Sequence, residues 1–289
     1  MKASRWKRSS CAVRAFLAAA ALASLAADAR AQATFSLSSG DATFSLGDVP
    51  GAADGSPASI VLRAGGGGNP NQAFQSWWWY RLAGDTRESA FHAANPVWTV
   101  NGAGNEATAT FTISPTLTGT MTWTLLGLGL GKLQLDSTMT IRNTGTQAAT
   151  VDLFHYLDLD LGGTRDDDSG AYTPRSGGTI PVITVTDPGW TADYIGDSAG
   201  FLGYRNAAFS TIRTQLTNNA VDNFNSTAAN FGPGDWTGGY QWSKTIDAGA
   251  TSRTRATVLL VPEPASLLLA GTGLAIVAAA AAGRRWRAV

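Results

Sequence analysis

The stretch LQLDSTMTIRNTGTQAATVDLFHYLDLDL, residues 133–161, decides how the chain folds. Apolar and polar side chains alternate along residues 133–142, which is the period of a strand that buries one face. Residues 143–146 (NTGT) have the composition of a turn, and the alternation returns over residues 150–161. The stretch therefore predicts two long strands joined as a β-hairpin.

The same alternation recurs along the rest of the chain. ATFSL at residues 33–37 returns at residues 42–46 and predicts a second hairpin. Apolar residues spaced by three and four between Phe209 and Phe224 predict one short helix. A third hairpin is expected where the last two predicted strands flank an Ala-Gly-Ala turn. Further strands are expected at residues 107–114, 120–126, 179–186, 239–247 and 251–260. Together these elements predict an all-β fold, with residues 32–260 forming a single β-sandwich that carries one helix.

A long apolar segment follows the last predicted strand. Residues 265–283 are 19 consecutive uncharged residues, which as a helix would span roughly 28 Å, close to the thickness of a bilayer's hydrocarbon core. Two prolines end the strand before it, and the arginines after it are expected on the cytoplasmic side. The segment is flanked by Val261, Pro262, Glu263 and Pro264 on one side and by Arg284, Arg285 and Arg287 on the other.

A Pro-Glu-Pro motif, an apolar helix and a basic cluster in this order resemble the PEP-CTERM sorting signal of exopolysaccharide-producing Gram-negative bacteria. The resemblance covers residues 261–289, divided into the motif at 261–264, the membrane helix at 265–283 and the basic tail at 284–289. It implies handling by an exosortase that cleaves near the motif. It also implies delivery to the cell surface or extracellular matrix, with the chain anchored in the membrane at least transiently.

Residues 1–31 have the pattern of a signal peptide: a basic front, an apolar run at residues 15–27, and small residues at Ala29 and Ala31 for a signal peptidase to recognise. The apolar run is too short to span a bilayer. Removal of this segment takes away Cys11, the one cysteine of the chain. The exported part therefore has no disulfide, and its stability depends on its core.

The exported part is acidic. Between residues 32 and 260 there are 12 basic and 19 acidic residues, a net charge of −7, because the two ends hold nine of the 21 Lys and Arg residues. This charge argues against nucleic acid and anionic lipid as partners, and it favours solubility or cation binding outside the cell.

Five aspartates gather at the end of the strand at residues 150–161. Carboxylates this close repel one another unless water or a hard cation screens them, and Ca²⁺ binds oxygen ligands in loops of this kind. The alternative is a solvated acidic loop without a metal. The group consists of Asp158, Asp160, Asp166, Asp167 and Asp168.

An aromatic cluster is the other feature that points to binding. In a strand, Trp77 and Trp79 would face one way and Trp78 and Tyr80 the other. One pair is expected in the core, and the other could form a platform on which sugar rings stack. The alternative is that all four pack in the core.

A Gly-x-Ser-x-Gly motif at residues 196–200 resembles the nucleophile turn of serine hydrolases. Neither His92 nor His155 follows Ser198, as an α/β-hydrolase requires, and the same composition is common in turns. His155 lies on an apolar strand face, where a lone histidine is more often a core residue. We therefore expect no catalytic residues.

The sequence favours an exported, non-enzymatic protein with a structural or adhesive role in exopolysaccharide or biofilm. The alternative is a carbohydrate-binding module, with calcium as a candidate cofactor. A serine hydrolase that uses Ser198 is the third interpretation. The expected partners are signal peptidase, exosortase, the membrane and exopolysaccharide.

Overall fold

The computed structural model describes residues 33–48, 58–62, 70–91 and 96–263. The predicted signal peptide with Ala29 and Ala31, the apolar helix at residues 265–283 and the basic tail lie outside these ranges. Among the described residues, no helix has the length and apolar character needed to cross a bilayer.

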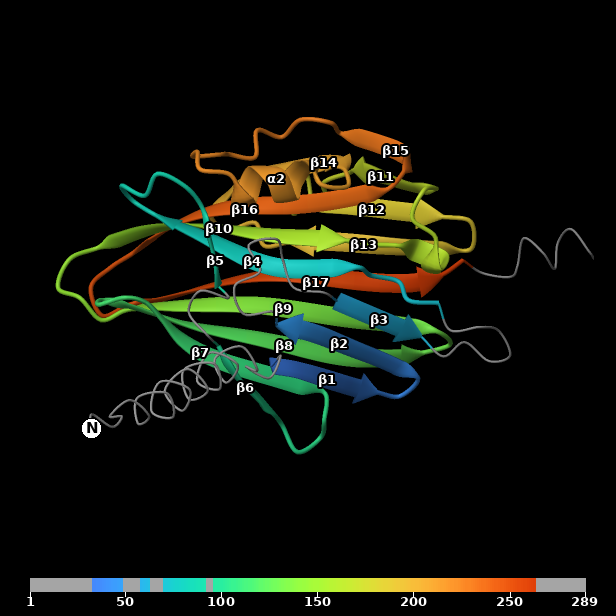
Figure 1. The fold of residues 1–289 in the computed structure, drawn as a ribbon, viewed down its shortest axis with the longest axis horizontal. Helices are drawn as coiled ribbons and strands as arrows, with labels where there is room; N and C mark the ends of the chain where they lie inside the picture. The colour runs from blue at the N-terminus through green and yellow to red at the C-terminus, as the bar shows by residue number, and fades with distance from the viewer. Residues whose placement is uncertain (1–32, 49–57, 63–69, 92–95, 264–289) are drawn as a thin grey trace, which may run out of the picture.

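The larger layer is a nine-stranded antiparallel sheet (Figure 1). Its strands follow the order β15-β11-β12-β13-β17-β9-β8-β7-β6. They are β6 (Val97–Val100), β7 (Glu106–Ser114), β8 (Leu117–Gly129), β9 (Lys132–Asn143), β11 (Asp168–Tyr172), β12 (Val182–Asp187), β13 (Trp190–Gly196), β15 (Asn230–Gly234) and β17 (Thr251–Pro262).

The second layer holds a five-stranded sheet and a three-stranded sheet. The larger one has the order β14-β16-β10-β4-β5, and the smaller one, β1-β2-β3, lies over β8 in Figure 1. The Gln72 N–H, in the segment that leads into β4, donates to the Ile60 carbonyl of β3 at 2.8 Å. The strands are β1 (Ala33–Ser39), β2 (Ala42–Asp48), β3 (Ala58–Leu62), β4 (Gln75–Leu82), β5 (Ser89–Ala90), β10 (Ala149–Asp158), β14 (Phe201–Ala208) and β16 (Trp236–Ile246).

Two of the three predicted hairpins are wrong. β9 pairs with β8 and β17, whereas β10 pairs with β4 and β16, so the turn at residues 144–148 carries the chain from one layer to the other. The turn at residues 247–250 does the same between β16 and β17. Alternation determines which face of a strand is buried but not which strand it pairs with, because both arms of such an arch bury one face in the same core. The hairpin of β1 and β2 is confirmed.

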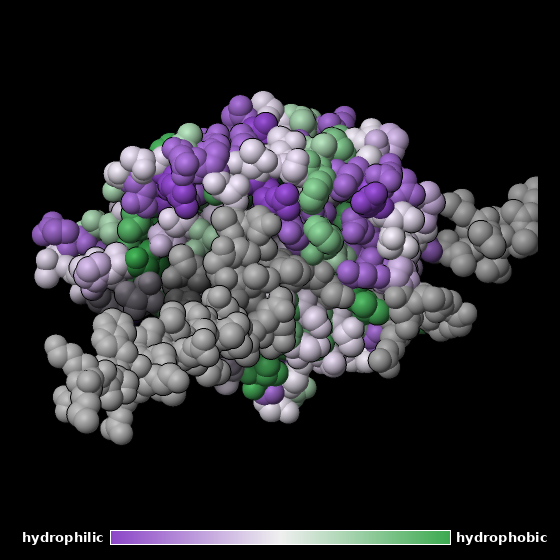
Figure 2. Space-filling view, viewed as in Figure 1, coloured by the Kyte–Doolittle hydropathy of each residue, from purple (hydrophilic) through white to green (hydrophobic). Residues whose placement is uncertain are grey.

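The predicted helix is present but short. α2 spans Thr211–Thr217, and it buries Ile212 and Leu216 against β14 and β16. Asparagines follow this segment, and they are poor helix formers. Figure 2 shows mostly hydrophilic side chains on the side of the molecule where α2 and β14 lie in Figure 1, as expected for a layer that faces water.

The two layers share one core of aromatic and aliphatic side chains. Phe44 of β2 stacks on Trp123 of β8 with 5.0 Å between ring centroids. His155 is 1% exposed, and its Nδ1 hydrogen-bonds with the Tyr194 hydroxyl of β13 at 2.7 Å. His155 is therefore a core residue.

The predicted sugar platform at residues 77–80 is wrong for its three tryptophans. Trp77, Trp78 and Trp79 are at most 1% exposed, and Tyr80 is half-buried. β4 lies between β10 and β5, and Trp78 points toward the nine-stranded sheet, where its indole N–H donates to the Ser137 hydroxyl at 2.6 Å. On the opposite face, Phe224 of the segment after α2 packs on Phe154 of β10, with 5.5 Å between ring centroids. Both faces of β4 are thus buried. The alternation of side chains along the strand therefore did not distinguish an exposed pair from a buried pair.

Candidate functional site

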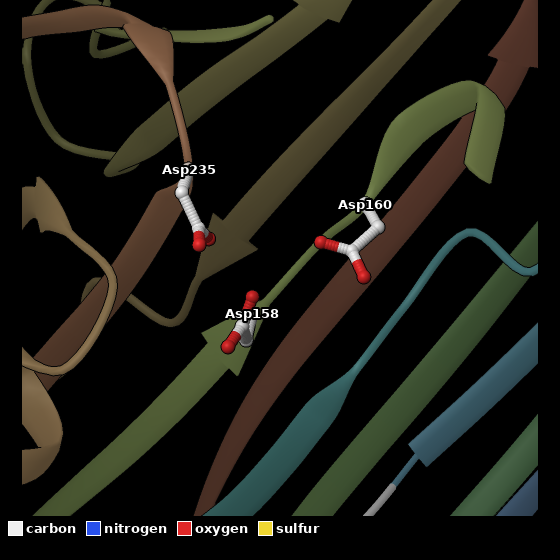
Figure 3. A group of neighbouring side chains, drawn as sticks. All are labelled: Asp158, Asp160 and Asp235. Atoms are coloured by element: carbon white, nitrogen blue, oxygen red, sulfur yellow. The ribbon is translucent and has the colours of Figure 1, made fainter. Parts of the chain in front are cut away.

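Three carboxylates converge where β10 ends (Figure 3). Asp158 is the last residue of β10, Asp160 precedes the short 3₁₀ turn η2 (Leu161–Gly163), and Asp235 lies between β15 and β16. One carboxylate oxygen from each lies within 4.8 Å of the others. We call these three residues the aspartate triad.

Asp158 is the buried member of the triad, with no exposed surface. Its Oδ2 accepts a hydrogen bond from the Tyr156 hydroxyl at 3.0 Å, and its Oδ1 has no partner. Burial raises the pKa of Asp158 to about 8, and the Asp160 charge adds to the rise. A buried carboxylate with a free oxygen is stabilised by a proton or by a bound cation.

The other two members share this electrostatic strain. Burial raises the pKa of Asp160 to about 6, with the Asp235 charge as the next cause. Burial, followed by the Asp166 charge, raises the pKa of Asp235 as well. A divalent cation would relieve this repulsion, and an all-oxygen set suits Ca²⁺ or Mg²⁺. The triad could therefore hold such an ion.

An aromatic pair adjoins the triad. The Phe74 N–H donates to the Asp158 carbonyl at 3.1 Å, and the Phe209 N–H donates to the Asp235 carbonyl at 2.8 Å. The two rings meet edge to face at 6.1 Å, and the Arg213 guanidinium lies 4.9 Å from the Phe209 ring centroid. The Phe74 residue is 47% exposed. The site thus combines an exposed apolar ring with carboxylates that can bind a cation or accept hydrogen bonds.

The predicted acidic group divides in the structure. Asp158 and Asp160 join the triad, while Asp166 is exposed and pairs with Arg165 at 3.7 Å. Asp167 is exposed, and Asp168 is buried at the start of β11. Sequence reasoning missed Asp235, which stands alone after the Gly-Pro-Gly that ends β15 and carries no local signal.

The Gly-x-Ser-x-Gly motif does not form a catalytic pair among the described residues. Ser198 is exposed in the turn between β13 and β14. His155 is enclosed in the core, where its two ring nitrogens face Tyr194 and Ser76. His92 lies outside the described residues.

A cleft of about 340 Å³ lies where β4 ends, lined by Arg81 and Asp152 among others. The Arg81 guanidinium donates to Glu88 at 2.6 Å, to Asp152 at 2.5 Å and to Asn223 at 2.7 Å. Its charge is thus compensated within the fold, and we assign it a structural role.

Solved structures share this fold. A GalM/aldose epimerase homologue from C. elegans matches with a TM-score of 0.53 and 6% identity, over 80% of this chain and 99% of that one. A bacterial glucoamylase complexed with acarbose matches with a TM-score of 0.50 and 9% identity, over 81% of this chain. The match spans 33% of the glucoamylase. At these identities the likeness shows a common fold alone.

The chain also matches a known sorting signal. No curated protein matches it in sequence. Residues 260–287 match the PEP-CTERM protein-sorting motif, in agreement with the signal predicted at residues 261–289. The chain therefore carries a PEP-CTERM protein-sorting motif, which follows an all-β sandwich.

Proposed function

We propose that this protein is exported, processed by an exosortase, and acts without catalysis as a polysaccharide-binding component of the cell surface or extracellular matrix. The observation that carries the proposal is the exposed Phe74 ring beside the aspartate triad. The fold is shared with one third of a bacterial glucoamylase that was solved in complex with acarbose. A purely structural role in the matrix is the second candidate, and the sorting motif supports both.

The site has both kinds of group that sugar recognition uses. The exposed part of Phe74 offers an apolar face to the C–H side of a sugar ring. Ca²⁺ takes six to eight oxygen ligands in proteins generally. Three monodentate carboxylates would leave positions that sugar hydroxyls can fill. Binding is therefore expected to depend on calcium.

Phe74→Ala is expected to weaken binding of the host's own polysaccharide about fivefold. Fully burying a Phe side chain contributes about 1.5–3 kcal/mol, and about half of this residue is still available for burial, so roughly 1 kcal/mol is lost. Isothermal titration calorimetry with the full-length protein measures the change.

Leu130→Ala is the matched control, because Leu130 is 90% exposed in the turn between β8 and β9. Its affinity should equal that of the wild type. Equal affinity of the Phe74 variant and the wild type would place the binding elsewhere. If the wild type still binds the polysaccharide in the presence of a chelator, binding does not require calcium. The contact between Phe74 and the sugar would then remain as the proposed interaction.

The mature protein is expected to lack both targeting segments. Cleavage after Ala31 and near the Pro-Glu-Pro motif would shorten the chain at both ends, which intact mass spectrometry of protein from the native cell detects. Glu263→Ala should retain the C-terminal segment and stay in the membrane fraction. Asp247→Ala, at an exposed turn, serves as the control. A native mass that includes residues 264–289 would contradict cleavage by the exosortase.

A further inference from the structure

Two further carboxylates, those of Asp168 and Asp187, lie beside the aspartate triad. β11 and β12 are antiparallel, and the last pair of their ladder is Ser169 opposite Thr186, so Asp168 and Asp187 follow it at adjoining strand ends. After burial, the Asp187 charge is the largest of the influences that raise the pKa of Asp168. Like charges on neighbouring strands destabilise a sheet. The fold nevertheless puts two aspartates there.

These carboxylates are buried and lack partners. Asp168 has no exposed surface, and neither of its carboxylate oxygens has a donor in full hydrogen-bond geometry, the Leu161 N–H being the one that comes near. Asp187 is 8% exposed, and its buried Oδ1 is also without a partner. In the part of the chain that the structure describes, no Lys or Arg forms a salt bridge with either residue. Buried charges are normally paired or bound to a metal, so three unpartnered oxygens call for a ligand.

The turn η2 closes over this pair. Gly162 has a φ of 69°, and a β-carbon there would lie 2.5 Å from Asp187 Oδ2. Only glycine lets the turn come this close to the carboxylate. On its other side β11 pairs with β15, where Asp168 lies opposite Gly234, the residue before Asp235 of the triad.

The local charge is strongly negative. Burial raises the pKa of Asp168 to about 8, and the charges of Asp187, Asp160 and Asp167 add to the rise, offset in part by the nearby Leu161 N–H. Burial and the Asp167 charge raise the pKa of Asp187 to about 6. Asp160 thus acts on both acidic groups, and a cation at either would favour the ionised form of its neighbours.

We propose that Asp168 and Asp187, with Asp167 at the rim, bind a calcium ion at a second site separate from the aspartate triad. The three free oxygens are hard ligands, and backbone carbonyls and water can complete the coordination. The ion would hold the first residue of β11 to the last residue of β12 and stabilise the turn η2 that leads from Asp160. Its role is structural, so it does not depend on polysaccharide binding.

Calcium titration of the full-length protein in detergent by calorimetry tests this site. We expect two ions per wild-type chain and one per chain in Asp187→Asn. Asp235→Asn should also bind one ion, by losing the triad site instead. Asp247→Asn, at an exposed turn, should still bind two. The melting temperature should rise with calcium in the wild type and rise less in Asp187→Asn.

Two results would overturn the second site. One is an Asp187→Asn variant that binds as many ions as the wild type. The other is an Asp168→Asn variant with unchanged calcium uptake and unchanged melting temperature, which would mean that a proton neutralises Asp168. If the wild type binds one ion and only Asp187→Asn loses it, the result supports the second site. It contradicts calcium binding at the aspartate triad.

Discussion

Replacing Trp78 by alanine is expected to lower the free energy of unfolding by about 3–5 kcal/mol, the range for removing a buried Trp or Phe side chain. Trp78 has no exposed surface, and its ring lies 4.6 Å from that of His155 and 5.6 Å from that of Trp242. Its hydrogen bond to Ser137 joins β4 of one layer to β9 of the other. The substitution therefore removes packing and the bond between the layers. Urea denaturation followed by circular dichroism measures the loss.

Two companion variants separate the causes. Ser137→Ala keeps the ring but leaves the buried indole N–H without an acceptor, which is expected to cost about 1–3 kcal/mol. Leu130→Ala should stay within about 0.5 kcal/mol of the wild type, as is usual for an exposed side chain. If Trp78→Ala left stability unchanged and weakened polysaccharide binding instead, the burial of the tryptophan cluster would be contradicted.

Acidification is expected to destabilise the fold through His155. Burial lowers the pKa of His155 to about 3, whereas in the unfolded chain it is about 6.5. Between these values the unfolded state binds a proton that the folded state does not. The contribution of neutral His155 to stability is therefore complete above pH 6.5 and lost as the pH falls, by about 1.4 kcal/mol per pH unit.

The measurement is the difference in free energy of unfolding between the wild type and His155→Gln, followed from pH 7.5 to about 4.5. The comparison with a variant is needed because Asp158 and Asp168 make the folded state more stable as the pH falls, which opposes the effect of His155. Their pKa values are raised to about 8, so the folded state binds protons there before the unfolded state does. The wild type should lose about 2–3 kcal/mol relative to the variant over this range. Parallel curves would show that His155 is protonated inside the fold.

The aspartates show which residues of the site could be predicted from local sequence patterns. Sequence alone placed Asp158 and Asp160 at the end of one strand, and their convergence in the triad agrees with this. Asp235 and Asp187 could not be found in this way, because the pairing of β15 and β12 with β11 brings them to the site from distant positions. Phe74 and Phe209 are likewise brought to the triad by backbone hydrogen bonds between separate strand ends.

The sequence by itself determined the properties that depend on near neighbours. The all-β class follows from alternation with period two, and the sorting motif follows from the order of prolines, apolar residues and arginines at residues 260–287. The tertiary structure decided which strands pair. The turns at residues 144–148 and 247–250 cross between layers because the pairing partners, not the turn composition, provide the long ladders of hydrogen bonds. It also buried both faces of β4, since a strand covered on its two sides has no wet face for alternation to reveal.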